Sequence, residues 1–282
     1  MDYYILNNGY KVPQFSFGMS FIKDRQNYEG YCRIINSAID GGFRWFDSAR
    51  DYGNEAIVGK AIKAVCTAKG IQRNEIFITT KVGNGQQAKG DLKKEIEISL
   101  NNLKTDYIDV WMLHWPYPEF YIDSWQQMID IYKEGKVRAI GICNMNAYYM
   151  NQLIAAEVEL LPMVIQNEIH PFNNDAEFIA LCIEHKILFE AHTSCGSMID
   201  KVIKNRVLIE LGLKYNKTIS QIILRWHYQK GRVAVTRSKN PQRCLALLDI
   251  FDFSLSVDDM NSIDLLNENY CIIPKSFCCI GY

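Results

Sequence analysis

Apolar, strand-like runs alternate regularly with amphipathic, helix-like segments along this chain of 282 residues. The strand-like runs cover residues 15–20, 43–48, 76–82, 108–114, 138–143, 163–168, 187–192 and 233–237. The helix-like segments cover residues 28–40, 54–69, 89–102, 123–134, 146–157, 175–186, 199–215 and 241–248. Continuous apolar runs suit strands that are buried on both faces of a parallel sheet. Eight strand-then-helix units predict an α/β protein with a closed (β/α)8 TIM barrel, which usually takes about 250 residues.

Further segments lie outside the eight repeating units. Two short strand-like runs, 3–6 and 10–12, flank Asn7-Asn8-Gly9 and predict an N-terminal β-hairpin. Helical spacing also predicts two extra helices, at residues 218–229 and 257–266. Because no internal repeat, low-complexity tract or linker interrupts the pattern, we expect a single barrel domain over residues 1–282.

An open, doubly wound sheet that binds a dinucleotide is the alternative fold. That fold needs G-x-G-x-x-G between an early strand and a helix, and the chain contains no such motif. It also lacks G-x-x-x-x-G-K-[ST], the phosphate-binding loop of another large class of α/β enzymes. The barrel therefore remains the preferred prediction.

Charge and hydrophobicity argue against nucleic-acid and membrane partners. The formal net charge is −1, the sequence pI is about 6.5, and no run of basic residues occurs. The N-terminus lacks a basic stretch followed by an apolar one, so it does not resemble a secretory signal. Apolar stretches stay shorter than the roughly 18 residues that a membrane span needs. We expect a soluble, cytoplasmic protein.

The nine cysteines show no pattern that indicates disulfides or a metal site. Their number is odd, their spacing is irregular, and no C-x-x-C pair occurs. We interpret most of them as small buried apolar residues, and we expect no metal.

Four polar residues lie at or just after the ends of three successive strand-like runs. Asp47, Lys81 and His114 each lie at the end of such a run, and Tyr52 follows Asp47 in the next loop. Taken singly, each residue has a structural explanation as a helix cap, packed aromatic, solvated strand end or core histidine. The ends of parallel strands meet at the mouth of a barrel, so together the four residues predict a site there.

Those four residue types suit carbonyl reduction. The reaction needs a hydride at carbon, which no side chain supplies, so a nicotinamide cofactor is expected. It also needs a proton at oxygen, which Tyr52 can supply although a free phenol has a pKa of about 10. We expect the Lys81 ammonium, held by Asp47, to lower the pKa of Tyr52. His114 can orient the carbonyl oxygen through a hydrogen bond.

The segment Asp47-Ser48-Ala49-Arg50-Asp51-Tyr52-Gly53-Asn54-Glu55 resembles the D-[ST]-A-x-x-Y-x-N-E signature of the aldo-keto reductases. Similar segments follow in the family's order at Phe77 to Val82, Leu113 to Pro116, Gly141 to Asn144, Gln166 to Pro171 and Ile223 to Trp226. The resemblance covers nearly the whole chain. It implies an NAD(P)H-dependent reductase of aldehydes or ketones in which Tyr52 is the proton donor.

The resemblance also implies where a nicotinamide would bind. Cys143, Asn144 and Gln166 match the positions that hold the carboxamide, with Cys143 in place of a serine. His192 stands where the family usually has a stacking tyrosine. As a hypothesis, a partly protonated His192 would disfavour the oxidised, cationic nicotinamide.

The segment Thr236 to Arg243 is similar to the family's phosphate-binding P-K-S-x-x-x-x-R pattern. Arg237 replaces the lysine, whereas Ser238 and Arg243 match. Because arginine binds phosphate in bidentate fashion, the segment favours NADPH over NADH. Leu247 and Leu248 replace a polar pair that follows in many relatives.

Aromatic residues near the expected barrel mouth suggest a modest-sized, largely apolar carbonyl substrate. We select Phe21 and Trp115 as substrate-binding residues. The family resemblance implies a monomer. Two other functions stay open: a cofactor-binding regulatory or low-turnover protein, and a lyase or isomerase that uses the cofactor transiently.

Overall fold

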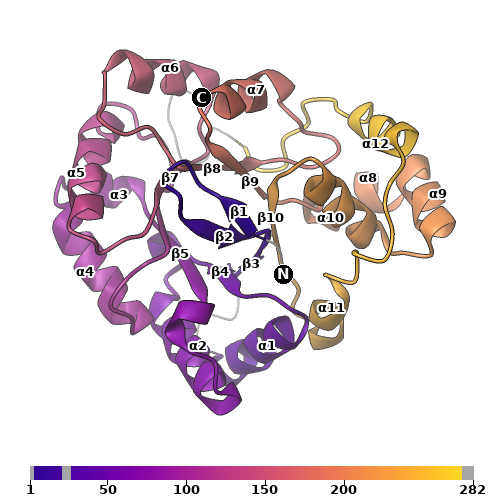
Figure 1. Cartoon of the computed structure of the whole chain (residues 1–282), viewed down its shortest axis with the longest axis horizontal. Helices are drawn as coiled ribbons and strands as arrows, with labels where there is room; N and C mark the ends of the chain where they lie inside the picture. Colours follow the sequence, from indigo (N-terminus) through magenta and orange to yellow (C-terminus); the bar gives the residue numbers. More distant parts are fainter. Residues whose placement is uncertain (1–2, 21–26, 275–282) are drawn as a thin grey trace.

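Eight parallel strands close into a barrel with the order β10-β3-β4-β5-β6-β7-β8-β9 in the computed structural model, which describes residues 3–20 and 27–274 (Figure 1). The barrel strands are β3 (Phe15–Gly18), β4 (Trp45–Asp47), β5 (Phe77–Val82), β6 (Val110–Leu113), β7 (Ile140–Cys143), β8 (Val164–Glu168), β9 (Leu188–His192) and β10 (Val233–Thr236). Most of their residues are buried, as expected for strands covered on both faces. The predicted (β/α)8 barrel is confirmed.

The predicted N-terminal hairpin is also confirmed. Strands β1 (Tyr3–Ile5) and β2 (Lys11–Pro13) pair in antiparallel fashion and lie across one end of the barrel (Figure 1). The Asn8 side chain donates to the Arg138 carbonyl, and the Tyr10 hydroxyl donates to the Asp109 carboxylate at 2.6 Å. Both partners precede the barrel strands β7 and β6, so the hairpin covers the amino ends of the strands and leaves the carboxyl ends open.

Helices surround the barrel (Figure 1). They are α1 (Tyr28–Asp40), α2 (Glu55–Lys69), α3 (Asn84–Gln87), α4 (Leu92–Leu103), α5 (Tyr121–Lys133), α6 (Ala147–Ala155), α7 (Ala176–Glu184), α8 (Asp200–Ile203), α9 (Arg206–Tyr215), α10 (Ile219–Gln229), α11 (Pro241–Ala246) and α12 (Val257–Asp264). Short 3-10 helices lie at η2 (Arg50–Tyr52), η3 (Arg73–Glu75) and η4 (Gly196–Met198). The two extra helices of the sequence prediction correspond to α10 and α12.

The helix predicted at 199–215 is wrong in one respect, because the chain breaks it into α8 and α9. Asn205 has an extended backbone, and its side chain accepts a hydrogen bond from the Leu208 N–H at the start of α9. A side-chain cap of this kind satisfies an N–H that the first turn of a helix leaves without a backbone partner. The short helix α3, after β5, is a further element that the sequence pattern did not predict.

Large aromatic side chains belong to the buried core. Trp45, Trp111, Trp125 and Trp226 are fully buried. The Trp45 indole N–H donates to the Thr79 hydroxyl at 2.7 Å, so this buried donor is satisfied. The barrel is therefore a packed core that carries its polar groups at the carboxyl rim.

Gly59 offers a test of how closely α2 packs against α4. A Cβ atom at Gly59 would lie 2.4 Å from the Leu103 Cα, whereas a Cβ at Gly85 meets nothing within 4 Å. We expect Gly59→Ala to lower the free energy of unfolding by about 1–3 kcal/mol, because the two helices must separate. Gly85→Ala is the matched control and should stay within about 1 kcal/mol of wild type. Urea unfolding of both variants measures the difference, and equal stabilities would contradict the close packing.

Candidate active site

The residues selected from the sequence gather at the carboxyl ends of the strands. Asp47 ends β4, Lys81 lies near the end of β5, and His114 directly follows β6. Tyr52 ends the 3-10 helix η2, which follows β4. These four residues, called the quartet below, therefore share one rim of the barrel, as the motif spacing predicts.

A buried ion pair lies at the base of this rim. The Lys81 Nζ lies 2.6 Å and 2.7 Å from the two carboxylate oxygens of Asp47, and it also donates to the Ser48 carbonyl at 3.1 Å. Lys81 is fully buried and Asp47 is 3% exposed. Burial on its own lowers the pKa of Lys81, but the adjacent Asp47 carboxylate outweighs it and holds this pKa above its usual value. Lys81 is therefore a fixed cation.

Tyr52 lies between this cation and an imidazole. The Lys81 Nζ lies 5.5 Å from the centroid of the Tyr52 ring, and the His114 ring lies 5.6 Å from it in an edge-on arrangement. The predicted net lowering of the Tyr52 pKa is wrong. Burial raises this pKa to about 12, and the opposing effect of Lys81 offsets only part of the rise. The phenol therefore keeps its proton throughout the neutral range.

His114 has a partner that the sequence prediction missed. Its Nδ1 lies 2.9 Å from an Asp51 carboxylate oxygen. A hydrogen bond from His114 is the largest influence on Asp51 and holds its pKa below the usual value, although burial opposes this. The one available signal was position, because Asp51 directly precedes Tyr52 within the signature segment.

The three residues expected to hold a carboxamide form a connected group. The Cys143 thiol donates to the Gln166 Oε1 at 3.4 Å, and the Asn144 amide donates to the Cys143 sulfur at 3.2 Å. Burial raises the pKa of Cys143, so the residue remains a thiol. Asn144 has a left-handed backbone with φ of 58°, a conformation that asparagine tolerates better than most residues.

His192 is neutral, contrary to the hypothesis of a partly protonated ring. Its Nε2 lies 2.9 Å from the Asn144 Oδ1, and its Nδ1 lies 3.1 Å from the Thr193 hydroxyl. Burial lowers the pKa of His192 to about 4, and the nearby Glu168 carboxylate compensates only partly. The charge effect on a nicotinamide that we expected from the sequence therefore falls away at neutral pH.

Glu190 is a second residue that the sequence prediction missed. This fully buried side chain on β9 accepts a hydrogen bond from the Gln166 Nε2 at 3.0 Å, and the same nitrogen donates to Asp47 at 2.9 Å. Burial raises the pKa of Glu190 to about 8, and the Asp47 charge adds to the rise. A glutamate inside an apolar strand-like run was the available signal.

The cationic loop after β10 lies at the surface. Arg237 and Arg243 are exposed, and Arg237 donates to the Ser20 carbonyl. The Ser238 hydroxyl accepts from the Asn240 N–H at 3.1 Å, which orders the turn into α11. Both guanidinium groups are therefore exposed near the carboxyl end of β10, Arg237 on the loop and Arg243 on the following helix α11.

Leu247 and Leu248, which follow this loop, are 8% exposed each and belong to the hydrophobic core. These side chains pack inward instead of lining the loop surface. Their apolar character therefore has a structural explanation, and the adenine contacts that a polar pair would supply are not available from them.

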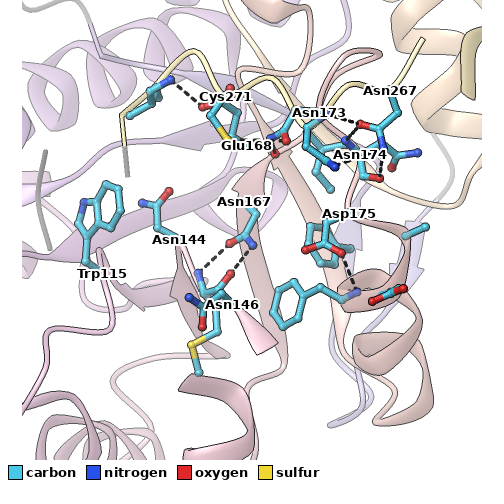
Figure 2. Close-up of a pocket in the computed structure, with 18 residues that line it drawn as sticks. Trp115, Asn144, Asn146, Asn167, Glu168, Asn173, Asn174, Asp175, Asn267 and Cys271 are labelled. Carbon is cyan, nitrogen blue, oxygen red and sulfur yellow. Dashed lines mark hydrogen bonds between the residues drawn. The ribbon is translucent and has the colours of Figure 1, made fainter. Parts of the chain in front are cut away.

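A cavity of about 510 Å³ lies beside Trp115 and Asn144 (Figure 2). Asparagine is the commonest residue in its described lining, at positions 144, 146, 167, 173, 174, 267 and 269. Glu168 also lines it and holds the C-terminal segment, because its two oxygens accept from the backbone N–H groups of Ile272 and Ile273 at 2.5 Å and 2.9 Å.

Trp115, one of the two predicted substrate-binding residues, lines this cavity, whereas Asp47, Tyr52, Lys81 and His114 are not among its lining residues. Phe21, the other predicted substrate-binding residue, lies outside the described residues. Tyr117 and Phe120 stack on one another with ring centroids 5.3 Å apart. The wall of the cavity combines amide and carboxylate side chains with apolar ones.

Within residues 3–20 and 27–274, His, Cys, Asp and Glu side chains nowhere gather in threes that could hold a metal ion. In the same described ranges, every helix is too short or too polar to cross a lipid bilayer. The cysteines that the structure describes are all free thiols.

Comparisons with known proteins agree with the fold and with the motifs. The model of the Aldo/keto reductase family matches residues 15–268. Glyoxal reductase of Bacillus subtilis is 36% identical over 270 residues, covering 96% of this chain and 94% of the relative. Methylglyoxal reductase DkgA of Salmonella typhimurium is 34% identical over 271 residues, covering 95% of this chain and 94% of the relative.

Solved structures give the same result. An aldo-keto reductase from a Medee basin deep-sea metagenome library superposes with a TM-score of 0.89 at 32% identity, covering 96% of this chain and 97% of that one. A Bombyx mori aldo-keto reductase in complex with NADP has a TM-score of 0.89 at 28% identity, covering 97% of this chain and 95% of that one. The chain belongs to the aldo/keto reductase family, whose members are oxidoreductases that use nicotinamide cofactors.

Glu190 gives a test of this buried network that does not depend on activity. Its pKa of about 8 in the folded protein exceeds its ordinary value of 4.5, so folding takes up a proton between these two pH values. The contribution of this proton to stability is therefore complete below about pH 4.5 and is lost as pH rises through about 8. Over this interval the free energy of unfolding falls by up to roughly 1.4 kcal/mol per pH unit. We expect Glu190→Gln to flatten this decline.

Urea unfolding at a series of pH values measures the slope. The exposed Glu177→Gln is the matched control, because it removes a carboxylate from the surface of α7 and should keep the wild-type slope. Parallel pH dependences for wild type and Glu190→Gln would show that Glu190 is ionised in the folded protein.

Proposed function

We propose that this protein reduces small, polar aldehydes or ketones to alcohols with NADPH. The single observation that carries the proposal is the position of the Tyr52 phenol between the Lys81 ammonium and the His114 imidazole at the barrel rim. A phenol that holds its proton beside a fixed cation is suited to protonate a developing alkoxide.

Each member of the quartet has a distinct part in this proposal. Tyr52 donates the proton of its hydroxyl to the carbonyl oxygen, and the positive charge of Lys81 stabilises the phenolate that remains. Asp47 keeps Lys81 in place through two hydrogen bonds. His114 orients the carbonyl oxygen, and a bound nicotinamide supplies the hydride.

The side chains present fit a nicotinamide dinucleotide. Asn144 and Gln166 combine amide donors and acceptors, which is the chemistry that a carboxamide requires. The exposed guanidinium groups of Arg237 and Arg243 suit a phosphate. These residues would hold the cofactor, and the cationic loop supports NADPH over NADH.

The substrate class rests mainly on the relatives. Amide side chains line part of the space beside Trp115 and Asn144 and offer hydrogen bonds to a ligand there. Relatives that cover nearly the whole chain are named glyoxal reductase and methylglyoxal reductase. We infer that compact carbonyl compounds with a second oxygen next to the carbonyl are the preferred substrates.

The Tyr52→Phe variant tests the proton donor. We expect this variant to lower kcat by about 10²–10⁴-fold, because it removes the acid, while the dissociation constant of NADPH stays nearly unchanged. Steady-state NADPH oxidation with methylglyoxal and fluorescence titration of NADPH measure the two effects. Tyr148→Phe is the control, because Tyr148 is exposed on α6.

Full activity of Tyr52→Phe would overturn the proposal. If the wild type oxidised no NADPH with a panel of aldehydes yet bound it tightly, the regulatory alternative would be favoured. Product formation without net NADPH oxidation would instead indicate a lyase or isomerase.

Arg243→Ala tests the preference for NADPH. Loss of one charge-assisted contact to phosphate should weaken NADPH binding by roughly tenfold or more and leave NADH binding nearly unchanged. Arg206→Ala is the matched control, since Arg206 is an exposed arginine on α9 that pairs with Glu210. Equal weakening of NADPH binding and NADH binding would show that Arg243 does not bind the additional phosphate of NADPH.

A further inference from the structure

Asp51 places a carboxylate against the imidazole of the proposed site. It lies in the middle of η2, between Arg50 and Tyr52, and its Oδ2 lies 2.9 Å from the His114 Nδ1. The Asp51 side chain is 45% exposed, whereas the His114 side chain is 13% exposed. A half-exposed carboxylate needs a local reason to hold one position.

Gly83 provides the space that this position requires. A Cβ atom at Gly83 would lie 2.2 Å and 2.3 Å from the two carboxylate oxygens of Asp51, closer than real Cβ contacts allow. The Gly83 backbone has φ of −85° and ψ of 177°, which any residue can adopt. The glycine is therefore needed here for space and not for its backbone freedom. The Asp51 carboxylate lies directly against the chain that follows β5.

The proton on the His114 ring follows from this contact. An ionised carboxylate only accepts hydrogen bonds, so the His114 Nδ1 must carry a proton to bond Asp51. When the ring holds a single proton, the other nitrogen, Nε2, then presents a lone pair. Such a ring accepts a hydrogen bond and cannot donate one to a carbonyl oxygen.

We propose that Asp51 is a positioning residue that fixes the Nδ1–H form of His114, so that His114 donates to a carbonyl oxygen only when both ring nitrogens carry protons. The functional half of this inference rests on the proposed reduction. The structural half, which concerns the tautomer alone, stands independently. Reduction should therefore depend on the second ring proton.

Other ionisable groups face His114 from neighbouring elements. Tyr52 faces it from η2 with a pKa of about 12, and His192 on β9 has a pKa of about 4. Lys81 on β5 stays charged, because Asp47 raises its pKa. Glu190 titrates near pH 8, but it is common to wild type and to the variants below, so its effect cancels in their ratio.

Nitrogen-15 NMR of histidine-labelled protein tests the tautomer directly. The His114 signals are assigned by their loss in His114→Gln. At alkaline pH we expect the wild-type ring to show a protonated Nδ1 and an unprotonated Nε2. In Asp51→Ala we expect a protonated Nε2 to become populated. A wild-type ring protonated at Nε2, or the same tautomer in both proteins, would overturn the proposal whether or not the protein reduces carbonyls.

The pH profile of kcat/KM for methylglyoxal tests the consequence. Wild-type kcat/KM should fall by about tenfold per pH unit on the alkaline side, and the ratio of Asp51→Ala to wild type should rise correspondingly. A constant ratio would overturn the link to catalysis. Asp40→Asn is the control for loss of one carboxylate, because Asp40 pairs with Lys69 on the surface.

Gly83→Ala supplies a second route to the same result. The added methyl group should displace the Asp51 carboxylate and reproduce the tautomer and pH profile of Asp51→Ala. Gly85→Ala, two residues away in open space, should behave as wild type. If Gly83→Ala kept the wild-type tautomer, the proposed placement of Asp51 would be refuted.

Discussion

The hydrogen-bonded ion pair of Lys81 and Asp47 underlies the arrangement of the candidate site. Both side chains are buried on adjacent strands, so neither can find water if the other is removed. Breaking such a pair usually costs about 3–5 kcal/mol, because it leaves one uncompensated charge in the interior. The barrel therefore fixes a cation close to the Tyr52 ring without needing a flexible side chain at the surface.

Charge balance extends from this pair to the neighbouring strands. Gln166 donates one amide N–H to Asp47 and the other to Glu190. Because the interior holds one fixed cation opposite two carboxyl groups, the Glu190 proton keeps the group close to neutral below about pH 8. The same cluster thus supports the fold and sets the electrostatic potential beneath Tyr52.

The barrel and the gathering of the quartet could be predicted from the sequence. Both follow from repeating strand–helix periodicity and from the rule that parallel strands end at one rim. The Tyr52 pKa could not, since its direction depends on burial, which only the folded chain defines. The contacts of Asp51 with His114 and of Glu190 with Gln166 could not be predicted either. These partners lie 63 and 24 positions apart.

Glu168 holds the C-terminal segment by its backbone, since the N–H groups of Ile272 and Ile273 are its donors. Every residue except proline offers such an N–H, so this attachment imposes little restriction on which side chains occupy these positions. Mutations there can alter the cavity wall while the segment remains docked. Evolution can thus diversify ligand preference at this edge of the barrel without dismantling its anchoring point.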